Sequence, residues 1–213
     1  WLRYWQMVDR DLACYDDDAG RKRYVRFHDL HKVMLVDPAF TTNPESARSA
    51  IVIIGSDMEG KKHLVLEAAA LQVEPADLVV EIVNHMQNWG VVRVFIESVA
   101  QQSALLQLVR DKCAERSVPL TLEELKPGGR KKDIRIETLG PYIKSGQLLF
   151  HQMQLDLLEE YRRFRPGARF KDLLDALSYF PEAAPRFSAT LAGTASERSR
   201  CQLASYLERR RLA

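Results

Sequence analysis

The stretch HKVMLVDPAF, residues 31–40, decides the fold class, because an apolar run ends in a carboxylate and proline then stops it. A second apolar run, AIVIIG, spans residues 50–55, and a third, KHLVLE, spans residues 62–67. The short connection between them, residues 56–60, is typical of a hairpin. We therefore predict three consecutive strands that begin one sheet.

Helices and strands alternate after this hairpin. Pro75 suits the first turn of a helix, and Gly90 suits its end. Residues 91–97, VVRVFIE, predict a fourth strand that again ends in a carboxylate, and residues 119–125 predict a fifth. Two further helices are indicated by apolar residues at helical spacing: Leu105, Leu108, Val109 and Cys113 in one, Phe170, Leu173, Leu174 and Leu177 in the other. Antiparallel strands followed by strand–helix–strand units imply an α/β fold with a mixed sheet and helices on its faces.

Both ends of the chain differ in composition from this patterned middle. Residues 1–30 carry an acidic patch and then a basic patch, and we interpret them as a linker or docking arm. Residues 183–213 are rich in Ser, Ala and Arg, and we predict a basic tail that is largely mobile. The folded domain is then expected over residues 31–182. Because the chain opens on Trp1, we interpret it as a fragment of a longer protein.

Composition excludes several classes of protein. The 213 residues are 46% hydrophobic, which is enough for one buried core, and the formal net charge of +2 says little about partners. We find no apolar run of about 18 residues and no secretory signal, so we expect neither a membrane span nor export. The three cysteines show no CxxC spacing, which argues against a disulfide scaffold or a cysteine zinc site and suits a reducing compartment.

Two motifs are rejected on their chemistry. Residues 55–62, GSDMEGKK, nearly match a phosphate-binding loop, but Lys62 replaces the hydroxyl that binds magnesium, and the loop leads into a strand instead of a helix. We therefore predict a hairpin turn that binds no ATP. His28 and His31 have no further histidine or cysteine partners for a metal, and on a strand they would point to opposite faces.

Carboxylates at strand ends are the strongest functional signal. Asp37 and Glu97 each end an apolar strand, and parallel strands present their carboxyl ends at one edge of a sheet, where ligand crevices form. Asp172 or Asp175 on the last helix could add a third acid. Adjacent carboxylates repel each other, and Mg²⁺ or Mn²⁺ relieves that repulsion, so three or four of them suggest a two-metal phosphodiesterase. The alternative is that each acid is simply solvated, because Asp172 and Asp175 lie opposite the leucine stripe, as residues on a solvent face do.

Four segments, taken in order over residues 31–181, resemble the nuclease domain of large terminase subunits of tailed bacteriophages. They are VMLVDPAF with IVIIG, then FIESVAQQ, then GRKKDIRI with GQLLF, and finally DLLDALSY. This resemblance implies an RNase H-like fold and metal-dependent endonuclease cleavage of concatemeric viral DNA during genome packaging. It also implies double-stranded DNA, a packaging ATPase domain absent from this sequence, a small terminase subunit and a portal as partners, in the host cytoplasm.

Basic residues fit this interpretation. Arg130, Lys131, Lys132 and Arg135 are dense around two glycines, and we predict a flexible loop that contacts the backbone of duplex DNA. An ordinary solvated loop is the alternative. For the catalytic metal ligands the candidates are Asp37, Glu97, Asp175 and Asp172, with Asp175 preferred over Asp172 as the direct ligand. Two other functions stay open: another RNase H-like nuclease, such as a junction resolvase or transposase, and a non-catalytic DNA-binding or docking module.

Overall fold

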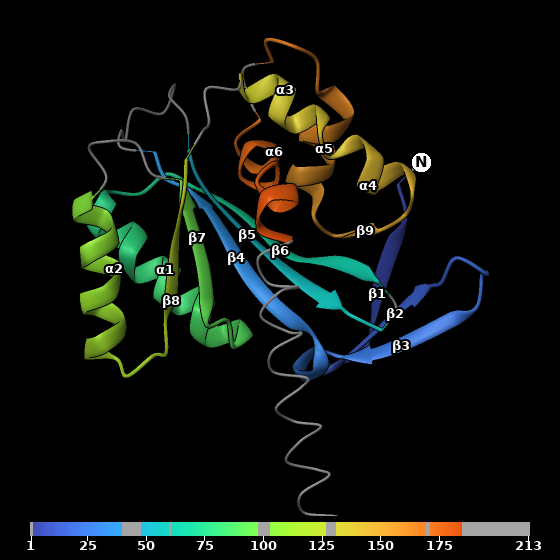
Figure 1. Cartoon of the computed structure of the whole chain (residues 1–213), viewed down its shortest axis with the longest axis horizontal. Helices are drawn as coiled ribbons and strands as arrows, with labels where there is room; N and C mark the ends of the chain where they lie inside the picture. The colour runs from blue at the N-terminus through green and yellow to red at the C-terminus, as the bar shows by residue number, and fades with distance from the viewer. Residues whose placement is uncertain are drawn as a thin grey trace, which may run out of the picture. The chain divides into compact units, whose positions relative to one another are not determined.

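The apolar runs of the sequence form the centre of one large sheet (Figure 1). This computed structural model describes residues 2–39, 48–59, 61–97, 103–126, 131–168 and 171–184. Within these residues the strand order is β3-β2-β1-β9-β6-β5-β4-β7-β8. The strands are β1 (Tyr4–Asp9), β2 (Leu12–Asp16), β3 (Lys22–Arg26), β4 (His31–Asp37), β5 (Ser49–Asp57), β6 (Lys62–Leu71), β7 (Arg93–Glu97), β8 (Thr121–Leu125) and β9 (Leu148–His151). The helices are α1 (Pro75–Trp89), α2 (Ser103–Glu115), α3 (Lys132–Glu137), α4 (Gly140–Lys144), α5 (Leu155–Arg163) and α6 (Asp172–Leu177), with a 3-10 turn at Phe27–Asp29.

The predicted mixed sheet is confirmed. Strands β4, β5 and β6 pair antiparallel, and the near-match to a phosphate loop is the turn between β5 and β6, as predicted. Strand β7 then pairs parallel to β4, and β8 pairs parallel to β7. The carboxyl ends of β4, β7 and β8 therefore lie at the same edge of the sheet.

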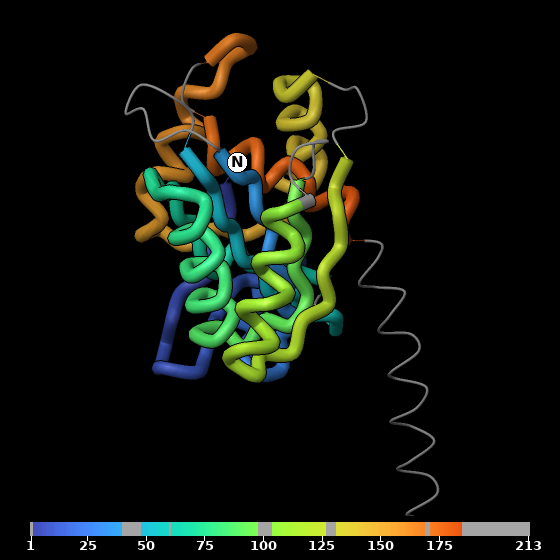
Figure 2. Tube along the Cα trace, turned by 90° about the vertical axis from the view of Figure 1, so that its left-hand side faces the viewer, coloured from blue at the N-terminus to red at the C-terminus, as the bar shows by residue number. Residues whose placement is uncertain are grey.

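Helices cover both faces of this sheet, and both views show α1 and α2 together on one of them (Figures 1 and 2). Their buried residues share a core with Met34 of β4, Ile53 of β5 and Val94 of β7. Side chains alternate between the two faces along each strand, and these three point to the face of α1 and α2. The other face is covered by α6, which contacts β4, β5 and β6. Helix α1 begins at Pro75 as predicted and ends at Gly90, whose φ of 64° is left-handed.

One residue of the predicted α2 stripe was assigned to the wrong face. The side chain of Leu108 is 48% exposed, and Leu106 is buried with Leu105 and Val109 instead. Leu106 and Leu108 flank the row of Leu105 and Val109 on opposite sides of the helix, and the apolar face of α2 that packs on the core includes the side of Leu106. In α6, Leu173, Leu174 and Leu177 are buried as predicted, while Phe170 lies outside the described residues.

The interpretation of residues 1–30 as a linker or docking arm did not anticipate regular structure in this segment. These residues form β1, β2 and β3, and β1 joins the sheet by pairing parallel to β9. Trp5 is buried and its indole N–H donates to the carbonyl oxygen of Val65 at 2.9 Å, while the hydroxyl of Tyr15 donates to Asp57 at 2.5 Å. The charged patches lie in the turn between β2 and β3 and on the largely exposed strand β3. In the sequence these charges obscured the apolar residues of β1 and β2.

Part of the predicted flexible basic loop is also regular. Residues 132–137 form α3, and residues 127–130 lie outside the described residues. The chain divides into a compact unit of residues 1–179 and a second unit of residues 180–213, of which only 180–184 are described. The predicted basic tail therefore lies almost wholly outside the described residues. Among the helices that are described, none combines the length and the apolar character that a membrane crossing requires.

Candidate metal centre

Strand register places two of the predicted acids side by side. In the parallel pair of β4 and β7, Leu35 is opposite Phe95 and Val36 is opposite Ile96. Side chains alternate along a strand, so Asp37 and Glu97 extend the row of Leu35 and Phe95 on the face that α6 covers. The same register brings both carboxylates to the carboxyl-end edge of the sheet.

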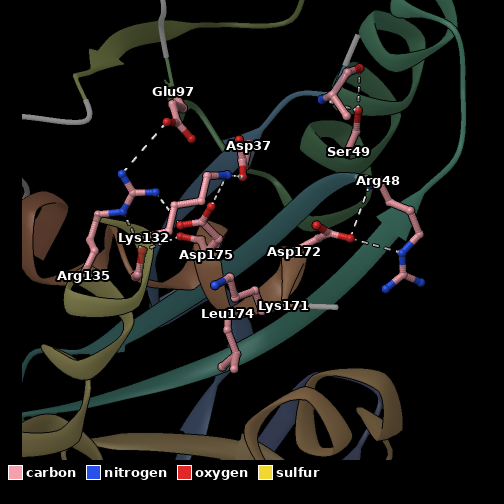
Figure 3. A network of polar contacts seen from close by, with 12 residues as sticks. Asp37, Arg48, Ser49, Glu97, Lys132, Arg135, Lys171, Asp172, Leu174 and Asp175 are labelled. Carbon is pink, nitrogen blue, oxygen red and sulfur yellow. Dashed lines mark hydrogen bonds and ion pairs between the residues drawn. The ribbon is translucent and has the colours of Figure 1, made fainter. Parts of the chain in front are cut away.

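Helix α6 supplies the third acid. Asp175 lies in its first turn, and its side chain is 1% exposed. One carboxylate oxygen from each of Asp37, Glu97 and Asp175 lies within 4.8 Å of the other two (Figure 3). The structure therefore gathers three predicted acids from two strands and one helix into one group, which we call the carboxylate cluster.

Two cations from α3 point into the carboxylate cluster (Figure 3). The guanidinium of Arg135 pairs with Asp175 and lies 3.9 Å from Oε1 of Glu97. The ammonium of Lys132 also pairs with Asp175 and lies 3.5 Å from Oδ2 of Asp37. Lys132 and Arg135 are three residues apart, so they lie on the same face of the helix.

The guanidinium of Arg135 is fixed by a hydroxyl and an aromatic ring in addition to the two carboxylates. Its Nε donates to the hydroxyl oxygen of Ser178 at 3.0 Å, and its guanidinium carbon lies 4.0 Å from the ring centre of Tyr179. The hydroxyl of Ser178 in turn donates to the backbone carbonyl oxygen of Asp175, so the same network fixes the helix that carries the third acid. The side chain of Arg135 is only 8% exposed.

The electrostatics of the carboxylate cluster favour a bound cation. Burial raises the pKa of Asp37 well above its usual value, the adjacent Glu97 raises it further, and Lys132 only partly offsets these effects. Oε2 of Glu97 is buried and has no hydrogen-bond partner among the described residues. All the donor atoms are hard carboxylate oxygens, the ligands that Mg²⁺ and Mn²⁺ prefer. The three oxygens lie within 4.8 Å of one another, so one cation can contact carboxylates from more than one of these residues. The residues therefore fit a divalent cation.

Asp172 lies outside this cluster and has different partners. Its carboxylate accepts hydrogen bonds from the backbone N–H and the Nε of Arg48, at 3.3 Å and 3.4 Å (Figure 3). Arg48 also pairs with Glu160 on α5 at 3.3 Å, and Glu160 accepts the backbone N–H of Leu174 at 3.0 Å. This network links the start of α6 to α5 and to the residue that precedes β5, so it supports the position of the helix.

The four residues predicted to bind DNA divide into three cases. Arg130 lies outside the described residues, and Lys131 is exposed just before α3. Lys132 and Arg135 pair with acids of the carboxylate cluster, and their predicted contact with DNA stays a prediction. The sequence pattern did not indicate these ion pairs, because a cation that pairs with a buried acid looks the same in a sequence as a solvated one.

Sequence reasoning missed Arg48 and Glu160. A signal existed for Glu160, because it follows Leu157 by three residues and therefore lies on the apolar face of α5. An acid at such a position needs a partner. Arg48 offered no such signal, since it follows a polar connection without periodic spacing.

We expect Glu160 to give the stability of the protein a distinct pH dependence. Burial, and secondarily Asp172, raise its pKa from 4.5 to about 7. Because the folded state then holds the proton more tightly than the unfolded state, stability falls as pH rises from about 4.5 to about 7. Urea unfolding of Glu160→Gln at several pH values should lack this fall. Glu159→Gln, a change at its half-exposed neighbour, should retain the fall, and parallel profiles for wild type and Glu160→Gln would refute the assignment.

The comparisons with known proteins support the fold. No family model and no curated protein sequence matches the chain. The nuclease domain of the P22 large terminase aligns with a TM-score of 0.52 over 71% of this chain and 80% of that chain, at 15% identity. The nuclease domain of the g2p large terminase of bacteriophage SPP1, solved with bound Mn, aligns with a TM-score of 0.46 over 72% and 86%, at 10% identity. The fowlpox virus Holliday junction resolvase gives 0.48 over 71% and 99%, at 13% identity. The predicted similarity to large terminase nuclease domains and the predicted RNase H-like mixed sheet are confirmed at the level of fold.

Proposed function

We propose that the chain is a divalent-metal-dependent DNA endonuclease, the nuclease domain of a large terminase subunit that cuts concatemeric viral DNA during genome packaging. The observation that carries the proposal is the carboxylate cluster, in which acids from β4, β7 and α6 converge within 4.8 Å of one another. A fold similar to that of the P22 terminase nuclease domain supports it. The alternative that each acid is simply solvated does not explain the cluster, because the three side chains are buried or nearly buried.

Each residue of the site has a separate task in this proposal. Asp37, Glu97 and Asp175 hold two Mg²⁺ or Mn²⁺ ions, and Arg135 orients Asp175 and Glu97 through its paired contacts. When bound, the metals supply activation of the attacking water and stabilisation of charge on the leaving 3′ oxygen. Asp172 acts through Arg48 and the start of α6, without direct ligation. No histidine is needed as a general base.

The proposed partners follow from the same function. Double-stranded DNA is the substrate, and the packaging ATPase domain, the small terminase subunit and the portal are the proposed protein partners. The site of action is then the cytoplasm of the infected host. Arg130 and Lys131 remain our candidates for contact with the DNA backbone, since Lys131 is exposed beside the cluster at the beginning of α3.

Plasmid and branched substrates test the proposed function together. In Mn²⁺, the full chain should nick and linearise supercoiled plasmid, and it should show no preference for a synthetic four-way junction over a duplex of the same length. Asp37→Asn and Glu97→Gln should both be inactive while still binding duplex DNA. Strong preference for the junction would instead identify a resolvase, and binding without any cleavage would identify a non-catalytic module.

We expect the double substitution of Arg130 and Lys131 by alanine to weaken binding to every duplex sequence alike. Phosphate contacts release counterions, so the slope of log affinity against log salt should flatten by about 0.9 for each lost contact. Fluorescence anisotropy over a salt series measures this slope. The matched control is Arg110→Ala with Lys112→Ala, which removes two positive charges from α2. An unchanged slope in the Arg130 and Lys131 variant would show that this segment does not contact DNA.

A further inference from the structure

The two cations in the carboxylate cluster differ in how firmly they are held. Arg135 is 8% exposed and is fixed by two carboxylates, a hydroxyl and an aromatic ring. The side chain of Lys132 is 54% exposed, and apart from its ion pairs with Asp37 and Asp175 nothing described fixes its ammonium. A lysine carries its charge on a flexible chain of four carbons, so Lys132 can leave the cluster by rotating into solvent. Arg135 has no comparable route.

Lys132 stands where a divalent ion would bind. Its Nζ bridges the carboxylates of Asp37 on β4 and Asp175 on α6 (Figure 3). Burial alone would lower the pKa of Lys132, but Asp37 and Asp175 outweigh that effect, so its pKa is raised and the group is charged at neutral pH. Any cation shared by the same two carboxylates would therefore lie within a few ångströms of a like charge.

Charge balance points the same way. Lys132 and Arg135 together offset two of the three carboxylate charges in the cluster. With both cations in place the cluster carries a net charge of −1, so one divalent ion would change it to +1 and two would change it to +3 in a largely buried site. Such an excess is costly in a medium of low dielectric constant.

We propose that Lys132 is a displaceable internal counter-ion, which neutralises the carboxylate cluster before metal binds and must withdraw before the full complement of divalent ions can enter. The proposal rests on the proposed nuclease function and adds a regulatory step to it. Lys132 competes with the metal, so metal occupancy depends on what draws its ammonium away. The phosphate backbone of an arriving DNA strand is a suitable anion for that purpose, which would make full metal loading follow DNA binding.

Calorimetric titration of the full chain with MnCl₂ tests this competition without any measurement of cleavage. Lys132→Gln removes the competing charge and should bind Mn²⁺ about tenfold more tightly than wild type, or gain a second binding event. Lys131→Gln removes the same charge from the adjacent residue and should change the affinity by less than about twofold at moderate salt. Lys132→Arg keeps the charge and should bind no more tightly than wild type.

Thermal unfolding gives a second readout and checks that the variants fold. In EDTA, Lys132→Gln should unfold at a lower temperature than wild type, because its carboxylates have lost a counter-ion, and Mn²⁺ should raise its Tm by more than it raises that of wild type. Equal Mn²⁺ affinity in wild type and Lys132→Gln would overturn the proposal, and so would equal tightening in Lys131→Gln. If wild type binds Mn²⁺ and Asp175→Asn does not, such a result refutes only the counter-ion. If no variant binds Mn²⁺, the metal-dependent function fails as well.

Discussion

Asp175→Asn is expected to lower the rate of Mn²⁺-dependent plasmid nicking by at least about a thousandfold, which corresponds to about 4 kcal/mol of activation free energy. Asn keeps the size and polarity of the side chain but removes the charge that a divalent ion requires. Because Asp175 is buried within the carboxylate cluster, no solvent-exposed acid can replace it. The nicking rate under single-turnover conditions measures this loss directly.

Asp172→Asn is the matched comparison, because it makes the same chemical change one turn away on the same helix. Asp172 pairs with Arg48 outside the cluster, so its loss should lower the rate by less than about tenfold. Circular dichroism should show that both variants remain folded. Equal loss in the two variants would contradict the separate roles, and a larger loss in Asp172→Asn would make Asp172 the ligand.

Arg135→Met is expected to destabilise the protein by about 3–5 kcal/mol, the usual cost of removing one member of a buried ion pair. The substitution leaves Asp175 and Glu97 buried without their fixed counter-ion and also removes the donor to Ser178. Urea unfolding in EDTA measures the loss. The stability of Arg135→Lys should lie between that of wild type and that of Arg135→Met, because an ammonium keeps the charge but cannot reproduce the planar contacts of the guanidinium.

Mn²⁺ should restore part of this lost stability, because it supplies positive charge to the same carboxylates. Arg163→Met is the control, since Arg163 forms an exposed pair with Glu159 on α5, and such pairs contribute less than about 1 kcal/mol. A loss in Arg135→Met no greater than that in Arg163→Met would show that the buried network is not important for stability.

The centre of the fold could be predicted because each element carried its own signal. The apolar runs that form β4 and β5 are shorter than a typical helix, so their length favours strands. Pro75 and Gly90 mark the two ends of α1. The strand-end acids Asp37 and Glu97 followed from parallel pairing, since register alone brings their side chains to one edge. Local patterns of this kind can be recognised in a single sequence.

Other features depend on contacts that no local pattern encodes. Strands β1 and β2 looked like a charged arm, and only the pairing of β1 with β9 and the burial of Trp5 make them part of the sheet. The inward turn of Arg135 depends on Asp175, which is 40 residues away in the chain. Asp172 and Asp175 could not be ranked by a helical wheel, because the partner that distinguishes them, Arg48, precedes β5 and is 124 residues away from Asp172 in the chain.

Plasmid nicking by the full chain, compared in Mg²⁺, Mn²⁺, Ca²⁺ and EDTA, tests the central claim most directly. We expect nicking in Mn²⁺ and Mg²⁺, with Mn²⁺ at least as effective because it tolerates imperfect ligand geometry better. We expect no nicking in EDTA and its return when Mn²⁺ is added in excess, while DNA binding persists throughout. Asp37→Asn should be inactive under every condition. Undiminished cleavage in EDTA would contradict the account, because the carboxylate cluster could not then act by holding a metal.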